Sequence, residues 1–445
     1  MLTSDRTRAS SRNAGTDTSS HTSRDAAEAL DAADPLAACR ELFTGDLPDG
    51  GWDDGPDRRL YLDGNSLGRL PRATPAAVAR VVEQEWGRGL VGSWPGWIGQ
   101  AGRVGDALAT GVLGARPGEV LVGDSTSVDL YKLLVAGCDA RPGRDVLVCC
   151  ADDFPTDRYV VAGVAGARGM TVREVDADVD QGLDPAVLAA ALDERVAVVV
   201  LSLVAYRSGA LLDMAAVTAL ARESGALVLW DLSHAAGAVD VQLTAAGADL
   251  AVGCTYKHLN SGPGAPAFLY VRGELQEQLR QPVWGWFGQR DQFAIGPAYD
   301  PAPGIDRFAV GSPPVLATAA VEVGVAVTAA AGVPAIAAKA RGLTDLLVAL
   351  ADERLAGHGV RLASPREASR RGAHVSLAHP QAWQLTQALL DRGVVPDFRT
   401  PDRLRLGPAP LYTRYVDVWD AVDRLVTVLD TGAQDAYPTE RSRVT

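Results

Sequence analysis

Near-continuous apolar runs alternate with amphipathic stretches through the middle of the chain. The apolar runs predict strands at 145–150, 170–175, 196–204, 226–231, 249–253 and 266–271. Helical periodicity lies between them, as in 185–195 and 214–224. Strands that are apolar at nearly every position are typical of a parallel sheet buried on both faces. The alternation therefore predicts an α/β fold, with a mostly parallel sheet flanked by helices.

The pattern changes towards both ends of the chain. Residues 74–90 predict an amphipathic helix, and beyond about residue 312 the chain is mainly helical, with weak strand candidates at 373–378 and 403–406. We expect a smaller α+β domain there. Residues 1–34 are rich in Ser, Thr, Asp, Arg and Ala, which predicts a disordered N-terminal tail.

Composition and charge exclude several classes of function. The 445 residues carry 42 basic and 55 acidic side chains, so the net charge is −13, which argues against nucleic-acid binding. No apolar run approaches the roughly 20 residues of a membrane span, and the N-terminus lacks the apolar core of a secretory signal. The five cysteines form no CxxC pair, which favours a reducing, cytoplasmic location and no metal site.

Lysine is rare. Only Lys132, Lys257 and Lys339 are present, which leaves 42 − 3 = 39 arginines among the basic residues. A lysine with a chemical role therefore has few possible positions.

A first candidate for chemistry is VLVGDSTSVDLYKLLVAG at 120–137, which predicts a strand, a polar turn and a helix. Free N–H groups at a helix start, with nearby hydroxyls, bind anions such as phosphate. The alternative is ordinary capping of the helix by Ser or Thr.

Two further candidates lie at the ends of later predicted strands, 226–231 and 249–253. Asp231 ends a buried strand in LWDLSHAAG, where a carboxylate could hold a protonated ring nitrogen or simply cap the following segment. Lys257 stands in a Gly- and Pro-rich turn after the next strand, 257 − 231 = 26 residues later. Lysine in a turn is usually only solvated, but here its placement at a strand end suggests a Schiff-base amine. A phosphate site, a carboxylate and this lysine together are the parts that hold pyridoxal phosphate.

At this point the sequence resembles the kynureninases, which are fold-type-I pyridoxal-phosphate enzymes. The resemblance covers about residues 60–425 and rests on eight motifs in the family's order. They are YLDGNSLG (61–68), DSTSV (124–128), DFPTD (153–157), WDLSHAAGAV (230–239), YKHLNSGPGAPAF (256–268), GWFG (285–288), PAPGIDRFAVGSPP (301–314) and RLRLGPAPLY (403–412).

The resemblance implies roles for individual residues. Lys257 would carry the cofactor as a Schiff base, and Tyr256 beside it would relay a proton. Cofactor contacts are implied for Thr126, Ser127, Phe154, Asp157, Ser202, Asp231, His234, Tyr256, Trp286 and Ser312. Arg405 would bind the substrate α-carboxylate, with Asn65 as a second substrate contact.

The resemblance also implies an organisation and a reaction. It implies a tail at 1–34, a segment at 35–95 that joins the small domain, a large cofactor domain at 96–311 and a small domain at 312–445, in a homodimer that binds no nucleic acid or membrane. The reaction would be hydrolysis of L-kynurenine, or its 3-hydroxy form, to anthranilate or 3-hydroxyanthranilate and L-alanine.

Departures from the family pattern lie towards the aromatic end of the substrate. Gln289 follows GWFG, Ser261 replaces a glycine in NSGPGAP, and the loop GSWPGWIG has no histidine. They leave the preferred ring open, including a ring-modified analogue in secondary metabolism. A catalytically idle cofactor-binding protein and a desulfurase are the two rival hypotheses. A desulfurase needs a cysteine late in the chain, and none follows Cys254.

Overall fold

The structure is a computed structural model that describes residues 22–440. Its larger sheet has seven strands in the order β2-β8-β7-β6-β5-β3-β4. They are β2 (Val120–Gly123), β3 (Val146–Cys150), β4 (Thr171–Val175), β5 (Val196–Ser202), β6 (Leu227–Asp231), β7 (Leu250–Gly253) and β8 (Ala267–Val271). β8 is antiparallel to both of its neighbours, and the β7-β6-β5-β3-β4 pairings are parallel. The predicted strands and the α/β class are confirmed.

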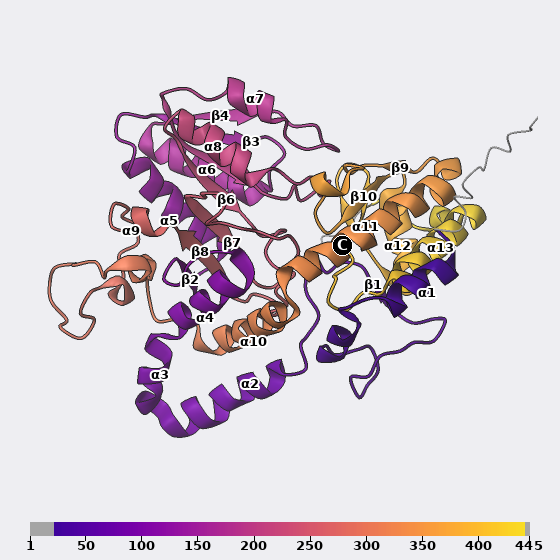
Figure 1. The fold of residues 1–445 in the computed structure, drawn as a ribbon, viewed down its shortest axis with the longest axis horizontal. Helices are drawn as coiled ribbons and strands as arrows, with labels where there is room; N and C mark the ends of the chain where they lie inside the picture. The colour runs from indigo at the N-terminus through magenta and orange to yellow at the C-terminus, as the bar shows by residue number, and fades with distance from the viewer. Residues whose placement is uncertain (1–21, 441–445) are drawn as a thin grey trace, which may run out of the picture.

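Helices cover both faces of this sheet, as the apolar strands require (Figure 1). α5 (Thr126–Asp139) and α6 (Pro155–Arg168) pack on one face. α4 (Gln100–Leu108), α7 (Pro185–Ala190), α8 (Met214–Glu223) and α10 (Val315–Ala331) pack on the other. The short helix α9 (Gly273–Gln276) follows β8.

The second domain is an antiparallel sheet with helices, in the order β12-β13-β10-β9. Its strands are β9 (Arg361–Leu362), β10 (Val375–Ala378), β12 (Asp397–Arg399) and β13 (Arg403–Leu406). Its helices are α11 (Val333–Leu350), α12 (Ala382–Leu390) and α13 (Tyr415–Thr431). β1 (Leu60–Tyr61) pairs in parallel with β11 (Val394–Val395), so a segment near the start of the chain is part of this domain.

Two expected boundaries need correction. Residues 24–32 of the expected tail form helix α1 (Arg24–Ala32), whose buried Ala27 joins the small-domain core, while residues 1–21 lie outside the described part. The expected boundary at residue 312 is also wrong, because Val321 and Val325 of α10 pack into the core of the large sheet. The change of domain falls within α11, because Val333 still packs in the core of the large sheet and Leu343 packs in the small-domain core.

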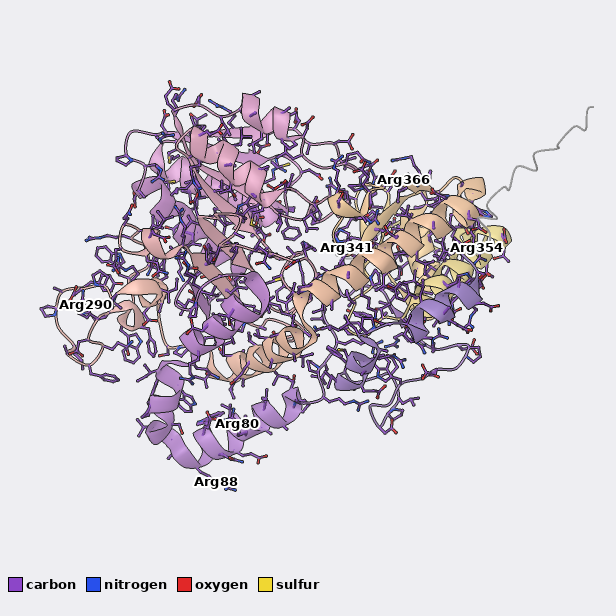
Figure 2. The ribbon with its side chains drawn as sticks, viewed as in Figure 1. Arg80, Arg88, Arg290, Arg341, Arg354 and Arg366 are labelled. Carbon is purple, nitrogen blue, oxygen red and sulfur yellow. The ribbon has the colours of Figure 1, made fainter. Side chains whose placement is uncertain are left out.

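The predicted helix at 74–90 forms as α2 (Thr74–Arg80) and a π-helical continuation (Val81–Gly89), and α3 (Trp94–Ile98) follows. These elements make an arm that extends from the large domain (Figure 1). Arg80 and Arg88 lie on this arm, and Arg290 lies on a second projecting loop (Figure 2). Val81 is buried, but Trp86 is 57% exposed. Part of the apolar stripe that predicted the helix therefore faces outward.

Among the described residues no single helix is long and apolar enough to cross a membrane. One pair, Val315–Ala331 with Val333–His358, passes by length and composition only, and it is bent by 80°.

Candidate active site

A cavity of about 250 Å³ lies where the parallel strands of the large sheet end and the small domain begins. All but three of the predicted site residues line it. Its lining is Asn65, Ser66, Thr126, Ser127, Phe154, Thr156, Asp157, Tyr206, Asp231, Ser233, His234, Tyr256, Lys257, Arg399 and Arg405. The topology explains the gathering, because the carboxyl ends of parallel strands meet at one edge of a sheet.

Lys257 lies beyond β7 and reaches the bottom of this cavity. Its Nζ is 3.1 Å from His234 Nε2. Loss of solvent lowers the pKa of Lys257, and burial followed by the nearby Lys257 charge lowers the pKa of His234 well below its usual range. The lowered pKa makes the uncharged amine, which is the nucleophilic form, easier to reach than it is for a lysine in water.

Asp231 and Asp157 form a pair of neighbouring carboxyl groups in the same cavity as Lys257. Asp231 ends β6 and accepts a hydrogen bond from the Ser233 N–H at 2.8 Å. Burial, and then the neighbouring Asp231, raise the pKa of Asp157 well above its usual range. Asp157 Oδ2 is buried with no hydrogen-bond partner among the described residues. The pair can share one proton and present a carboxylate to a cationic ring nitrogen.

The start of α5 forms the polar end of the cavity. Thr126 and Ser127 line it, and Ser125 precedes them as the N-cap residue in an extended conformation. Within the described chain no side-chain hydrogen bond caps this helix start. Its first N–H groups are therefore left for an anion, which favours the phosphate interpretation over simple capping.

Two predicted aromatic residues, Phe154 and Tyr256, line the cavity. Phe154 begins α6 and packs edge-on against Tyr206, with ring centroids 5.3 Å apart. Tyr256 precedes Lys257, and burial followed by the nearby Cys254 raises the pKa of its hydroxyl. The Tyr256 hydroxyl therefore stays protonated and can donate a hydrogen bond into the cavity.

The small domain closes the cavity with Arg405 of β13, which is buried. Its guanidinium donates to the Tyr206 carbonyl at 2.6 Å and to Ser66 Oγ at 2.9 Å, and it forms an ion pair with Asp397. With the amide oxygen of Asn65 turned towards it, Asn65 accepts from Arg405 Nε at 2.9 Å. Arg405 is thus held rigidly at the cavity by residues from three separate parts of the sequence.

Three predicted residues do not line the cavity. Ser202 ends β5 and borders a neighbouring cavity of about 450 Å³, where its N–H donates to Asp153. Trp286 lies 43% exposed in an aromatic cluster with Trp94 and Phe293, and Ser312 lies on an exposed turn. In a single chain, Trp286 and Ser312 are surface residues.

The sequence reasoning missed five lining residues, namely Ser66, Thr156, Tyr206, Ser233 and Arg399. Ser66, Thr156 and Ser233 lie inside quoted motifs, beside residues that were chosen, so the motifs contained a usable signal. Tyr206 and Arg399 lie outside them. No pattern in the sequence singles these two residues out.

Comparison with known proteins places this geometry in context. The family model for the kynureninase C-terminal domain matches residues 336–425. Kynureninase of Pseudomonas fluorescens is 44% identical over 431 residues, which is 95% of this chain and 99% of that protein. A kynureninase of Burkholderia pseudomallei is 46% identical over 418 residues, 92% of this chain and 96% of that protein.

Solved structures with less similar sequences share the fold. The apo structure of a cysteine desulfurase from Thermococcus onnurineus has a TM-score of 0.73 at 16% identity, and covers 84% of this chain and 95% of that chain. A variant of C-DES with glycine covalently linked to its PLP cofactor has a TM-score of 0.73 at 18% identity, with 83% and 96% covered. The architecture is therefore the fold-type-I architecture of pyridoxal-phosphate enzymes, as expected.

Proposed function

This chain belongs to the kynureninase family, and from that premise we propose that it hydrolyses L-kynurenine to anthranilate and L-alanine with pyridoxal 5′-phosphate as cofactor. 3-Hydroxy-L-kynurenine is the second candidate substrate and would give 3-hydroxyanthranilate. The observation that carries the proposal is the convergence of Lys257, Asp231, the open start of α5 and Arg405 on one cavity.

The cavity residues fit this cofactor. The uncapped start of α5, with Thr126 and Ser127, would hold the phosphate. Asp231, with the Asp157 carboxyl beside it, would hold the ring nitrogen in its protonated form. Phe154 would pack against the ring face. When bound, pyridoxal phosphate supplies an aldehyde that joins amines and an electron sink for bonds at the substrate α-carbon.

The protein side chains would then bind the substrate and move its protons. Arg405 would hold the α-carboxylate through its guanidinium, with Asn65 and Ser66 fixing its direction. The Lys257 amine, once free, would take the α-proton, a role that the lowering of its pKa by loss of solvent assists. Water adds at the γ-carbonyl and the β–γ carbon bond breaks. The β-carbon then receives a proton, for which the Tyr256 hydroxyl is our candidate donor.

We further propose that the working unit is a cytoplasmic homodimer in tryptophan catabolism. Trp86 and Trp286 are large apolar side chains exposed on the arm and on the projecting loop, and such surfaces mark protein interfaces. Burial against a second copy would bring Trp286 and Ser312 to the partner's cavity, which accounts for their distance from the cavity of their own chain.

The test is a comparison of two substrates on purified protein. The cofactor-loaded protein is incubated with L-kynurenine or 3-hydroxy-L-kynurenine, and product fluorescence and alanine are followed in parallel. We expect product from at least one substrate, and none from Lys257→Ala. Absence of product from both, in a protein that binds the cofactor, would contradict the hydrolase and favour a catalytically idle cofactor-binding protein.

A further inference from the structure

Lys132 is buried on α5, about one and a half turns beyond the candidate phosphate site, and takes no part in the chemistry proposed above. It is one of the three lysines of the chain and is 1% exposed. Its Nζ lies 2.8 Å from Asp124 Oδ2 and 2.9 Å from Asp129 Oδ1. Asp129 is on the same helix, but Asp124 precedes the helix, at the end of β2. Lys132 therefore links the polar turn, through Asp124, to the helix that follows the turn.

Asp124 has an unusual backbone. Its φ is +48°, in the left-handed region that side chains other than glycine seldom adopt. Its carbonyl accepts from the Ala267 N–H of β8 at 3.2 Å, so the residue is anchored to the sheet as well as to Lys132. Strained residues of this kind persist where the surroundings hold them in place. Asp124 lies two residues before the first residue of α5, so its conformation affects how the chain enters the helix.

The charge of Lys132 is a second reason to expect it to affect anion binding at the start of α5. Asp124 and Asp129 put two carboxyl groups beside a helix start that has to accept an anion, and negative charge there would oppose a phosphate. Lys132 offsets that charge at hydrogen-bond distance. Asp129 is deeply buried, and loss of solvent raises its pKa to about 7 in spite of the lysine. Asp124 is the carboxyl group of the two that belongs to the turn itself.

We propose that Lys132 is a positioning residue for the cofactor phosphate, acting through Asp124. It holds Asp124 in the left-handed conformation that aims the start of α5 into the cavity, and it neutralises the Asp124 carboxylate next to the bound phosphate. The proposal rests on the proposed function, because it needs the phosphate at the start of α5.

The experiment measures the dissociation constant of pyridoxal phosphate for the full-length apoprotein, together with the thermal midpoint of each apoprotein. Lys132→Met is expected to weaken cofactor binding about tenfold or more, as the loss of a residue that orients a binding group commonly does. Adding Asp124→Asn to Lys132→Met should restore much of the affinity. Asparagine tolerates the left-handed conformation and carries no charge.

The chain offers a matched control in Lys339. That lysine is also buried and paired, with Nζ 2.7 Å from Asp34 Oδ2, but it lies on α11 and does not line the cavity. Lys339→Met should lower the thermal midpoint and leave the dissociation constant unchanged. If Lys132→Met behaves in the same way, or if Asp124→Asn restores nothing, Lys132 is only a structural ion pair and the proposal is overturned.

A second series keeps the test decisive if Lys132→Met does not fold. Asp124 is 32% exposed, so its substitution leaves no cavity in the core. Asp124→Ala removes the ion pair with Lys132, and alanine adopts a positive φ less readily than aspartate does. This variant should therefore bind the cofactor about tenfold more weakly. Asp124→Asn should stay within about twofold of wild type. Equal affinities for these two variants would overturn the proposal. Failure of the wild type to bind the cofactor would instead refute the proposed function, and this inference with it.

Discussion

The two walls of the cavity are built in opposite ways. On the large-domain wall, His234 and Asp157 are buried and Lys257 is half-buried. Loss of solvent shifts the pKa of each of the three towards its uncharged form. On the small-domain wall, Arg405 is held by Asp397, Ser66 and the Tyr206 carbonyl. One wall keeps its groups reactive, and the other keeps a charge fixed in place.

The contrast follows from what each wall has to do. Proton transfer and nucleophilic attack need groups whose charged forms are not stabilised too well, so desolvation helps. Recognition of a carboxylate needs a permanent charge in a defined direction, so a network of acceptors around the guanidinium helps. Substitutions on the large-domain wall should therefore reduce turnover, and substitutions on the small-domain wall should reduce substrate binding.

The largest effect is expected for Lys257→Ala. Removal of the amine takes away both the attachment of the cofactor and the group that moves the α-proton, so turnover should fall about 10⁴-fold or more. The measurements are anthranilate formation and the visible absorbance of the lysine-bound cofactor, and both should be lost. Lys339→Met, which removes a buried lysine elsewhere, should keep both. Substantial turnover in Lys257→Ala would disprove the assignment.

Arg405→Leu should reduce kcat/KM for kynurenine about 10²- to 10³-fold, mainly through KM. It removes a buried, hydrogen-bonded charge partner, a loss commonly of about 2–5 kcal/mol. Arg403→Leu is the control, because Arg403 lies on the same strand and pairs with Asp180 and Asp402 but does not line the cavity. If Arg405→Leu and Arg403→Leu change kcat/KM by the same factor, Arg405 has no specific role in substrate binding, and the proposed difference between the two walls is wrong.

Tyr256→Phe should lower kcat about 10²-fold while the cofactor stays bound, because only the donated proton is removed. Stopped-flow measurement of anthranilate release would separate a slow proton transfer from slow substrate binding. Near-full activity in this variant would refute the proton-donor role of Tyr256 and leave the remaining assignments intact.

Asp63 does not line the cavity, but it interacts electrostatically with Arg405 and Asp397 of the small-domain wall. Its Oδ1 is buried and without a partner in the described chain. Burial, and then Asp397, raise its pKa to about 6. The folded carboxyl thus keeps a proton that the unfolded chain loses near pH 4. Its contribution to stability is fully present below that pH and is lost as pH rises through about 6.

Urea unfolding of wild type and Asp63→Asn at several pH values checks this expectation. The difference between the two proteins should change by at most about 3 kcal/mol between pH 4 and 7, with wild type losing stability relative to the variant as pH rises. A difference that is independent of pH would show that Asp63 has the same pKa in the folded and unfolded chain, and would contradict the expectation.

Much of the large-domain wall could be predicted from the sequence. Asp231 and Lys257 follow apolar strands, and parallel strands bring their carboxyl ends to one edge, so placement along the chain predicted closeness in space. The start of α5 was predictable for the same reason. The helix at 24–32 was not, because its short, polar sequence is stabilised by packing against α13 rather than by its own pattern.

By itself, the sequence determined the alternation of strands and helices, the rarity of lysine and the order of the motifs, because each depends on neighbouring residues. Only the tertiary structure decided how Arg405 is held, since its partners Ser66 and Tyr206 lie 339 and 199 residues away. It also decided that Lys132 faces Asp124 and that Trp286 stays on the surface. Contacts between distant segments form when separate elements pack together, and no local pattern along the chain records which segments will meet.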